Sequence, residues 1–266
     1  MPKIPARLAF VLLCVTSTLG AQTDDGTTFR WSGRVPAGHA IRLSNMNGDI
    51  RVERGGGPDV EVTGQRKVRR GDPKVVRFEV RMRTDGDVAI CALWGPDMRC
   101  TDDGGQGSYR SGGWKSGEEI SVDMRVLVPD GVRTVARSTN GNVNADGLTS
   151  DIDASTTNGD VNVRTTGAIT NATSTNGSVT ARLGALRGNE PMRFSTTNGS
   201  VTVFAPASLS AEVELSTTNG TLTTDFPLTT NGALSNRRMR GTIGSGGRTL
   251  VVHSTNGDVS IKRGGR

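Results

Sequence analysis

The chain has 266 residues, of which aromatic residues make up only 4%, whereas glycine alone occurs 36 times. Such a composition excludes a broad core of large side chains and leaves a thin core of valine, isoleucine, leucine and alanine. The net charge is +6, and two of these charges lie in the first 21 residues, so the remainder carries +6 − 2 = +4. That mild excess does not by itself call for a specific nucleic-acid partner.

Residues 1–21 are expected to be a signal peptide. Lys3 and Arg7 give a positive start, "LAFVLLCVTSTLG" is an apolar stretch, and Gly20-Ala21-Gln22 offers small residues for cleavage. The apolar stretch is shorter than the roughly 20 residues that span a membrane. A lipoprotein acylated at Cys14 is the alternative, although leucines rather than small residues precede it. We expect an exported protein, periplasmic, at the cell surface or secreted, with no transmembrane segment in the mature chain.

Residues 22–131 are predicted to form a less regular, β-rich N-terminal part that is continuous with the C-terminal half of the chain as one domain. "IRLSNMNGDIRV" places apolar residues on both sides of Asn47-Gly48. "VVRFEVRMR" and "ISVDMRVLVP" alternate apolar and polar residues, which is the period of a strand. Residues 101–119 are rich in glycine and are expected to be a mobile loop.

Two cysteines remain after the leader, Cys91 and Cys100, in "CALWGPDMRC". In an oxidising compartment such a pair is most simply a disulfide, and Gly95-Pro96 can turn the chain between them. The alternative is a redox or metal site, but the spacing matches neither a C-x-x-C dithiol nor a zinc knuckle.

A basic run crosses the N-terminal part in "GQRKVRRGDPKVVRFEVRMR". It is a candidate surface for an anionic ligand outside the cell, such as an acidic polysaccharide, a lipopolysaccharide or released nucleic acid. The other interpretation is a solvated face that keeps a strand edge from pairing with neighbours. The candidate residues are Arg66, Lys67, Arg69, Arg70, Lys74, Arg77, Arg81 and Arg83.

Residues 132–266 repeat one unit, in which Ser-Thr or Ser-Thr-Thr precedes Asn-Gly. Successive asparagines are separated by 18, 18, 22, 21 and 37 residues. Apolar residues recur four positions before each Asn and three after it, and polar residues lie between, so each turn is flanked by strands. The predicted structural turns are Asn140-Gly141, Asn158-Gly159, Asn176-Gly177, Asn198-Gly199, Asn219-Gly220 and Asn256-Gly257.

One Asn-Gly pair predicts a hairpin, because glycine tolerates positive φ. Six nearly identical copies favour a β-solenoid over a meander or sandwich. In a solenoid each copy lies directly on the preceding one, about 4.8 Å away, so like residues stack on like. Asparagine amides and the hydroxyls of the preceding threonines are expected to bond along the stack. These threonines are Thr139, Thr157, Thr175, Thr197, Thr218 and Thr255.

The passages "VLVPDGV…ARSTNGNV" and "GTIGSGGRTLVVHSTNGDVSI", with the serial T-N-G units between them, resemble the bacterial putative-adhesin family. That family is catalogued as a β-strand-repeat domain of unknown function. The resemblance extends over roughly residues 27–262. It implies an all-β, right-handed, single-stranded parallel β-helix exposed outside the inner membrane.

The sequence shows no catalytic constellation, and we expect neither a cofactor nor a metal. His253 falls in an outward-facing slot of the repeat, and no G-x-S-x-G motif singles out a serine. Asp49, Asp160 and Asp258 follow the turn, but the G-G-x-G-x-D spacing of a calcium β-roll is absent. Short polar residues are more simply suited to the exit of the turn.

Three functions therefore stay open. The first is an exported, non-enzymatic, adhesin-like or envelope-associated protein that binds a glycan or an anionic envelope polymer through its repetitive polar surface. The second is a polysaccharide lyase or hydrolase, which needs paired acids, or an acid beside Arg or Lys, on neighbouring coils. The third is a structural part that stacks end to end. The sequence leaves the oligomeric state undetermined.

Overall fold

The computed structural model describes residues 20–101, 104–106, 118–184, 189–230 and 235–264. Almost all of the predicted signal peptide and most of the glycine-rich stretch lie outside these ranges. The described residues form strands and one short 3-10 helix, η1 (Pro73–Val75). No described helix has the length and apolar character needed to cross a membrane.

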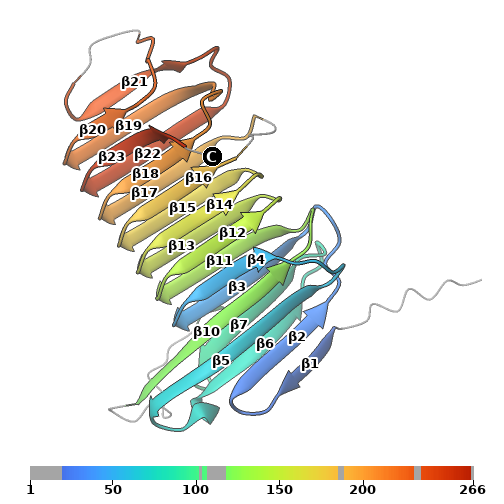
Figure 1. Cartoon of the computed structure of the whole chain (residues 1–266). Helices are drawn as coiled ribbons and strands as arrows, with labels where there is room; N and C mark the ends of the chain where they lie inside the picture. The colour runs from blue at the N-terminus through green and yellow to red at the C-terminus, as the bar shows by residue number, and fades with distance from the viewer. Residues whose placement is uncertain (1–19, 102–103, 107–117, 185–188, 231–234, 265–266) are drawn as a thin grey trace, which may run out of the picture.

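Two long sheets face each other and enclose the core (Figure 1). We call the first sheet A. Its described strands follow the order β1 (Ala21–Asp24), β2 (Thr28–Gly33), β5 (Val60–Arg70), β10 (Glu119–Val128), β4 (Ile50–Arg54), β12 (Val143–Leu148), β14 (Val161–Thr165), β16 (Val179–Leu183), β18 (Val201–Ala205), β23 (Val259–Arg263) and β20 (Leu222–Thr224).

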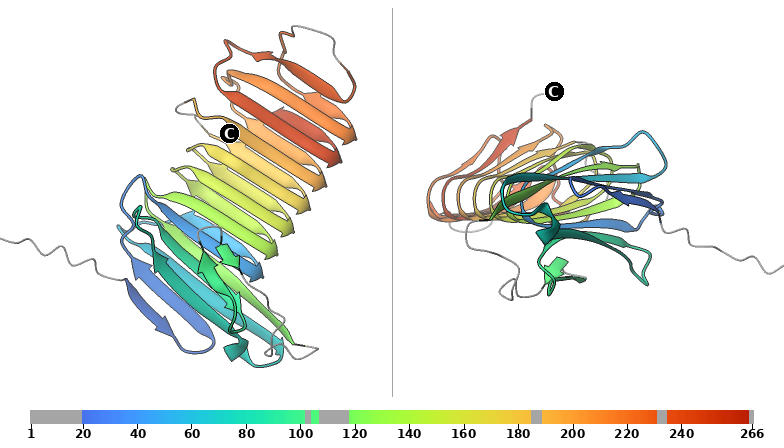
Figure 2. Two further views of the ribbon diagram at one scale, coloured as in Figure 1. Left: turned by 180° about the vertical axis from the view of Figure 1, so that it is seen from behind. Right: turned by 90° about the horizontal axis from the view of Figure 1, so that it is seen from below.

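The second sheet, sheet B, faces sheet A along the stack (Figure 2). Its described strands follow the order β21 (Arg238–Ile243), β19 (Ala211–Asn219), β22 (Thr249–Asn256), β17 (Met192–Asn198), β15 (Ile169–Asn176), β13 (Ile152–Asn158), β11 (Arg133–Asn140), β3 (Ala40–Asn47), β7 (Val88–Trp94) and β6 (Val76–Met82). A short pair, β8 (Arg99–Thr101) with β9 (Gly104–Gln106), forms a separate small sheet that packs against sheet B.

Each repeat is one coil of a solenoid, with its first strand in sheet B and its second in sheet A. β11 pairs in parallel with β13, so that Ala136 lies opposite Ala154 and Asn140 opposite Asn158. β12 pairs in parallel with β14, with Val143 opposite Val161. Like residues therefore stack on like, and the predicted solenoid is confirmed. The Asn-Gly pair does not close a hairpin, because the chain crosses there from one sheet to the other.

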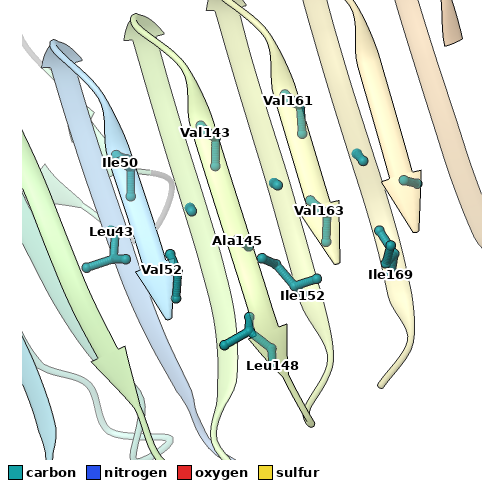
Figure 3. Packing of buried hydrophobic residues seen from close by; sticks show 14 of the residues in the cluster. Leu43, Ile50, Val52, Val143, Ala145, Leu148, Ile152, Val161, Val163 and Ile169 are labelled. Carbon is teal, nitrogen blue, oxygen red and sulfur yellow. The ribbon is translucent and has the colours of Figure 1, made fainter. Parts of the chain in front are cut away.

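The predicted apolar positions fill the space between the sheets (Figure 3). In the repeat region, the apolar residue that stands four positions before each asparagine, from Ala136 to Val252, is fully buried. So are Val143, Val161, Val179, Val201 and Val259, three residues after it. Alanine and valine predominate at these positions, as the composition predicts.

The last coil does not lie at the end of the stack. β22 lies between β17 and β19, and β23 lies between β18 and β20. The expectation that every copy lies on its predecessor is therefore wrong for the Asn219 copy, which is separated from the Asn198 copy by the last coil. After β18, the connection 206–210 carries the chain past one empty layer, and the C-terminal coil fills that layer. The single-layer connections 149–151 and 166–168 are shorter, whereas 184–191 is longer.

The early copy also belongs to the solenoid. β3 pairs in parallel with β11, and β4 with β12, so Asn47 lies directly beside Asn140 although 93 residues separate them. Beyond this coil the stack becomes antiparallel: β10 pairs with β5 and β5 with β2, while β7 pairs with β6 in the other sheet. The less regular N-terminal part therefore extends both sheets of the solenoid.

Candidate functional site

The Asn-Gly corners lie in one line along the stack, and their asparagines form a ladder of side-chain amides. Nδ2 of Asn158 donates to Oδ1 of Asn140 at 2.7 Å, and the same bond recurs at every later interface at 2.7–2.8 Å. The order of the ladder follows the stack, since Asn219 bonds to Asn256 rather than to Asn198. The predicted asparagine ladder is therefore present.

The hydroxyl contacts come from a different position than expected. The threonines directly before the asparagines are mostly exposed. The residue before each of them is buried, and its hydroxyl donates to the glycine carbonyl of the neighbouring coil at 2.7–3.1 Å. The donors are Ser138, Thr156, Ser174, Thr196, Thr217 and Ser254. Period two marks these positions as inward-facing, and this pattern in the sequence could have identified them.

The glycines of the corners are required by geometry. Gly159 has φ +149°, and a Cβ there would collide with the carbonyl oxygen of Gly141 in the next coil. Five of the other corner glycines, beginning with Gly48, also have positive φ, whereas Gly220 does not. In the described residues no asparagine adopts positive φ. The corner is thus a close backbone contact between coils rather than a two-residue hairpin turn.

The acids after the turn are acceptors for backbone amides of the next coil. Oδ1 of Asp49 accepts from the amide of Asn142 at 2.7 Å, and Oδ1 of Asp160 accepts from the amide of Ser178 at 2.8 Å. Asp258 accepts hydrogen bonds from both the backbone amide and the hydroxyl of Thr221. The hydrogen bond from the amide is the main reason that the pKa of this carboxyl is lowered. The structure gives these acids a role at the exit of the turn.

The first part of the basic run is already engaged within the fold. The guanidinium of Arg66 is buried, lies over the ring of Phe78, and donates to both carboxylate oxygens of Asp24 at 2.7 Å. These hydrogen bonds are the main reason that the pKa of Asp24 is lowered. Lys67 pairs with Asp123, and that hydrogen bond raises the pKa of the lysine.

The second part of the run holds the segment that contains the disulfide. Cys91 and Cys100 are bonded to each other, with 5.6 Å between their Cα atoms. Arg77 and Arg81 lie on the same face of β6 and donate to the carbonyl oxygens of Met98 and Cys100. Arg83 pairs with a neighbouring aspartate at 3.0 Å. Arg77 and Arg81 therefore fasten β6 to the disulfide segment, whereas the ion pair of Arg83 with Asp85 is local.

Three members of the run are exposed and take no part in these contacts. Arg69 and Arg70 at the end of β5, and Lys74 in η1, are exposed, and none makes an ion pair with another described residue. The structure thus divides the eight predicted residues into four groups. Arg66 is buried, Lys67 and Arg83 form ion pairs with nearby acids, Arg77 and Arg81 hold the disulfide segment, and the remaining three are exposed.

The outer face of sheet A carries a shallow groove that sequence reasoning did not identify. We call it the sheet A groove; it has a volume of about 470 Å³. It crosses β4, β12, β14 and β16, that is, four consecutive layers of the stack. The lining residues are Arg51, Glu53, Asn144, Ala145, Asp146, Asn162, Val163, Arg164, Thr180 and Arg182. The alternation of polar and apolar residues along each strand predicts that the polar lining residues face outward. However, only the pairing of β4 with β12 brings Arg51 and Glu53 next to the others.

Polar side chains form two columns in this groove. Asn162 donates to Oδ1 of Asn144 at 3.1 Å, and Thr180 follows in the next layer. In the second column Nε of Arg164 donates to Oδ1 of Asp146 at 2.6 Å. One layer further the guanidinium of Arg182 lies 4.1 Å from the centre of the Phe204 ring.

The acids of the groove are neutralised by arginines. Glu53 lies opposite Asp146 in neighbouring strands, which is the paired arrangement that a polysaccharide-cleaving enzyme would need. However, Glu53 accepts from Arg125 at 2.6 Å and Asp146 accepts from Arg164. Three exposed arginines, Arg51, Arg164 and Arg182, therefore leave the groove with an excess of positive charge.

His253 forms the one serine–histidine contact among the described residues. Its Nδ1 lies 2.9 Å from Oγ of Ser216 on the outer face of sheet B. Glu214 lies two residues before this serine on the same strand face, but Arg238 and Arg240 bind its carboxylate. No group of His, Cys, Asp and Glu among the described residues is arranged to hold a metal ion.

The fold and the corner geometry define the class: a β-solenoid of two sheets whose coils are joined by asparagine ladders. The chain belongs to the Toastrack DUF4097 family, whose model matches residues 116–262. No curated protein matches it in sequence.

Among solved structures, one described as a "putative cell adhesion protein" from Clostridium sporogenes is 10% identical. The match covers 89% of this chain and 99% of that chain, with a TM-score of 0.50, and it shows the same fold. A "putative adhesin" from Bacteroides fragilis is 13% identical over 89% and 96% of the two chains, with a TM-score of 0.33. Another, from Parabacteroides distasonis, is 14% identical over 90% and 98%, with a TM-score of 0.30.

Proposed function

We propose that this chain is an exported, non-enzymatic binding protein of adhesin type. It holds an acidic glycan or another anionic envelope polymer in the sheet A groove. The observation that carries this proposal is the groove itself, in which Arg51, Arg164 and Arg182 lie exposed beside a column of amides and hydroxyls.

The chemistry of these side chains suits a negatively charged polymer. The planar guanidinium group recognises carboxylate, sulfate or phosphate through two parallel hydrogen bonds. Amides and hydroxyls suit the many hydroxyl groups of a sugar. Because successive layers are about 4.8 Å apart, a repeating ligand meets a repeating set of partners. Many weak contacts then add to a useful affinity.

The carboxyl groups favour binding over hydrolysis. A glycosidase needs a carboxylic acid whose pKa is raised, so that it can protonate the leaving group. Among the described residues, every carboxyl pKa that moves clearly from its usual value moves downward: Asp24, Asp25, Asp85, Asp130, Glu214 and Asp258. In addition, both acids of the groove, Glu53 and Asp146, accept hydrogen bonds from arginines.

The disulfide supports the extracytoplasmic part of the proposal. Such bonds form and persist in oxidising compartments such as the periplasm and the cell surface. The adhesion-related descriptions of the structural relatives, and the expected signal peptide, agree with this location.

The test is a glycan array that includes uronate-containing, sulfated and neutral polysaccharides, probed with residues 22–266. We expect binding to acidic glycans that weakens as salt is raised. The variant Arg51→Ala/Arg164→Ala/Arg182→Ala should lose most of this binding while its melting temperature stays close to that of the wild type.

A second triple variant is matched in charge. Arg69→Ala/Arg70→Ala/Lys74→Ala also removes three exposed positive charges, but from the predicted basic run rather than from the groove. It should bind like the wild type. Binding that survives the first variant and is lost in the second would reject the sheet A groove. Cleavage of any bound polysaccharide would reject the non-enzymatic function.

A further inference from the structure

Three loops outside the repeat meet beside the early coil and enclose a second groove. They connect β2 to β3, β4 to β5 and β10 to β11. We call this space the loop groove; it is lined by residues 34–37, 54–58, 129–130 and Val132 and has a volume of about 710 Å³. That volume falls in the range of roughly 300–1,000 Å³ that is usual for small-molecule sites.

The walls of the loop groove are held in place before any ligand arrives. The amide of Gly38 donates to the carbonyl of Gly131 at 2.9 Å, and the amide of Gly55 donates to that of Val128 at 2.8 Å. Nε of Arg54 donates to Oδ1 of Asp130 at 2.8 Å. Pro36, Pro58 and Pro129 also restrict the backbone of the three loops. A ligand that binds here therefore orders little of the protein, and this saves binding free energy.

The charges of the groove favour an anion. Arg54 and Asp130 neutralise each other, and Thr149 also donates to this carboxylate at 2.6 Å. These hydrogen bonds, that of Arg54 first, lower the pKa of Asp130, so the pair stays charged at neutral pH. Arg34 is exposed and makes no hydrogen bond or ion pair with another described residue. Its guanidinium is the uncompensated charge of the lining.

The remaining lining is apolar or bare backbone. It consists of the three proline rings, the methyl group of Ala37, two valines and the glycines 55–57. Proline rings and methyl groups offer a flat apolar surface, on which an aromatic or aliphatic body can pack.

We propose that the loop groove binds a small molecule in which an anionic group is attached to an apolar or aromatic body. Arg34 pairs with the anionic group, and the prolines and Ala37 contact the body. This site is separate from the sheet A groove and does not depend on the function proposed above.

A matched pair of fluorescent probes tests the proposal on the folded, full-length mature chain. 8-Anilinonaphthalene-1-sulfonate carries a sulfonate, and N-phenyl-1-naphthylamine is its neutral counterpart. We expect Arg34→Ala to weaken binding of the sulfonate probe by about tenfold, as for loss of a charge-assisted contact. The same variant should leave binding of the neutral probe unchanged. Arg193→Ala, which removes an exposed arginine from sheet B, should alter neither.

A blocking variant tests the location independently of charge. At Gly56 a Cβ would meet no atom within 4 Å, and the backbone has no positive φ, so a side chain fits without strain. Gly56→Trp should therefore keep the wild-type melting temperature and yet lose both probes. Equal binding of the sulfonate probe to wild type and Arg34→Ala would overturn the proposal. So would unchanged binding to Gly56→Trp, or failure of the wild type to bind either probe.

Discussion

At the scale of single residues, the corner glycine is the position with the least freedom. Gly159 combines positive φ with a backbone approach so close that any Cβ collides with the next coil. Its neighbours in the corner have more tolerance, because Asn158 and Asp160 act through side chains on the surface. Composition alone shows an abundance of glycine, but only the stacked corners show which glycines are indispensable.

We expect Gly159→Val to lower the free energy of unfolding by about 2 kcal/mol or more, because backbone strain of this kind costs roughly 1–3 kcal/mol. The collision with Gly141 adds to this. The measurement is urea-induced unfolding followed by circular dichroism. Gly56→Val is the control, since that glycine has open space and no positive φ. Equal stability of the two variants would contradict the corner geometry.

At the scale of elements, the pair formed by Arg66 and Asp24 joins β1 to β5. The side chain of Arg66 is 3% exposed, and its hydrogen bonds are the main reason that the pKa of Asp24 is lowered. A carboxyl whose pKa is lowered by folding adds stability that is complete above its ordinary pKa. That stability is lost as the pH falls through the folded value.

The stability of the wild type should therefore decrease as the pH falls below about 4, the ordinary pKa of an aspartate. Asp24→Asn should make this decrease shallower. It should also destabilise the protein at pH 7, because it leaves a buried arginine without its carboxylate. The measurement is the free energy of unfolding in urea from pH 2 to 7.

Asp97→Asn is the control, at an exposed carboxyl that makes no hydrogen bond or ion pair with a described residue. It should leave the curve unchanged. If Asp24→Asn has the same pH dependence as the wild type, Asp24 is not linked to folding in this way.

Individual elements were predictable where the alternation of apolar and polar residues coincides with the near-identical sequences of the repeats. The strands of the coils and their buried positions follow from that pattern, as do the corners at Asn-Gly. The sheet A groove was not predictable, because Glu53 and Asp146 are far apart in sequence and meet only through the pairing of β4 with β12. Likewise the basic run reads as one surface, but contacts with Asp24, Met98 and Cys100 divide it.

At the scale of the whole molecule, the position of the last coil decides how the C-terminal residues behave. Chain ends usually fray and tolerate substitution. Here Ile261 lies five residues from the end of the chain, and yet it is 0% exposed, because β23 has a parallel neighbour on each side. The neighbouring Lys262 is exposed.

We expect Ile261→Ala to lower the free energy of unfolding by about 2–4 kcal/mol, as for a buried isoleucine in the middle of a chain. Ile152→Ala, in β13, should cost about the same, and Lys262→Ala should cost little. Thermal and urea unfolding measure all three. A cost for Ile261→Ala as small as that for Lys262→Ala would show that the C-terminal coil frays.

The far end of sheet B bears on end-to-end stacking. β21 pairs in antiparallel fashion with β19 and so occupies the strand edge that the next parallel coil would need. This arrangement disfavours continuation of the stack in register.

The intercalated coil also has a consequence for biosynthesis. A ribosome delivers the chain from its N-terminus onward, so residues 211–243 emerge while the layer beneath them is still missing. The strands that fill this layer, β22 and β23, follow later in the chain. Assembly of this end therefore waits until they have been made, and a product that terminates before them lacks the coil that joins β19 and β20 to the rest.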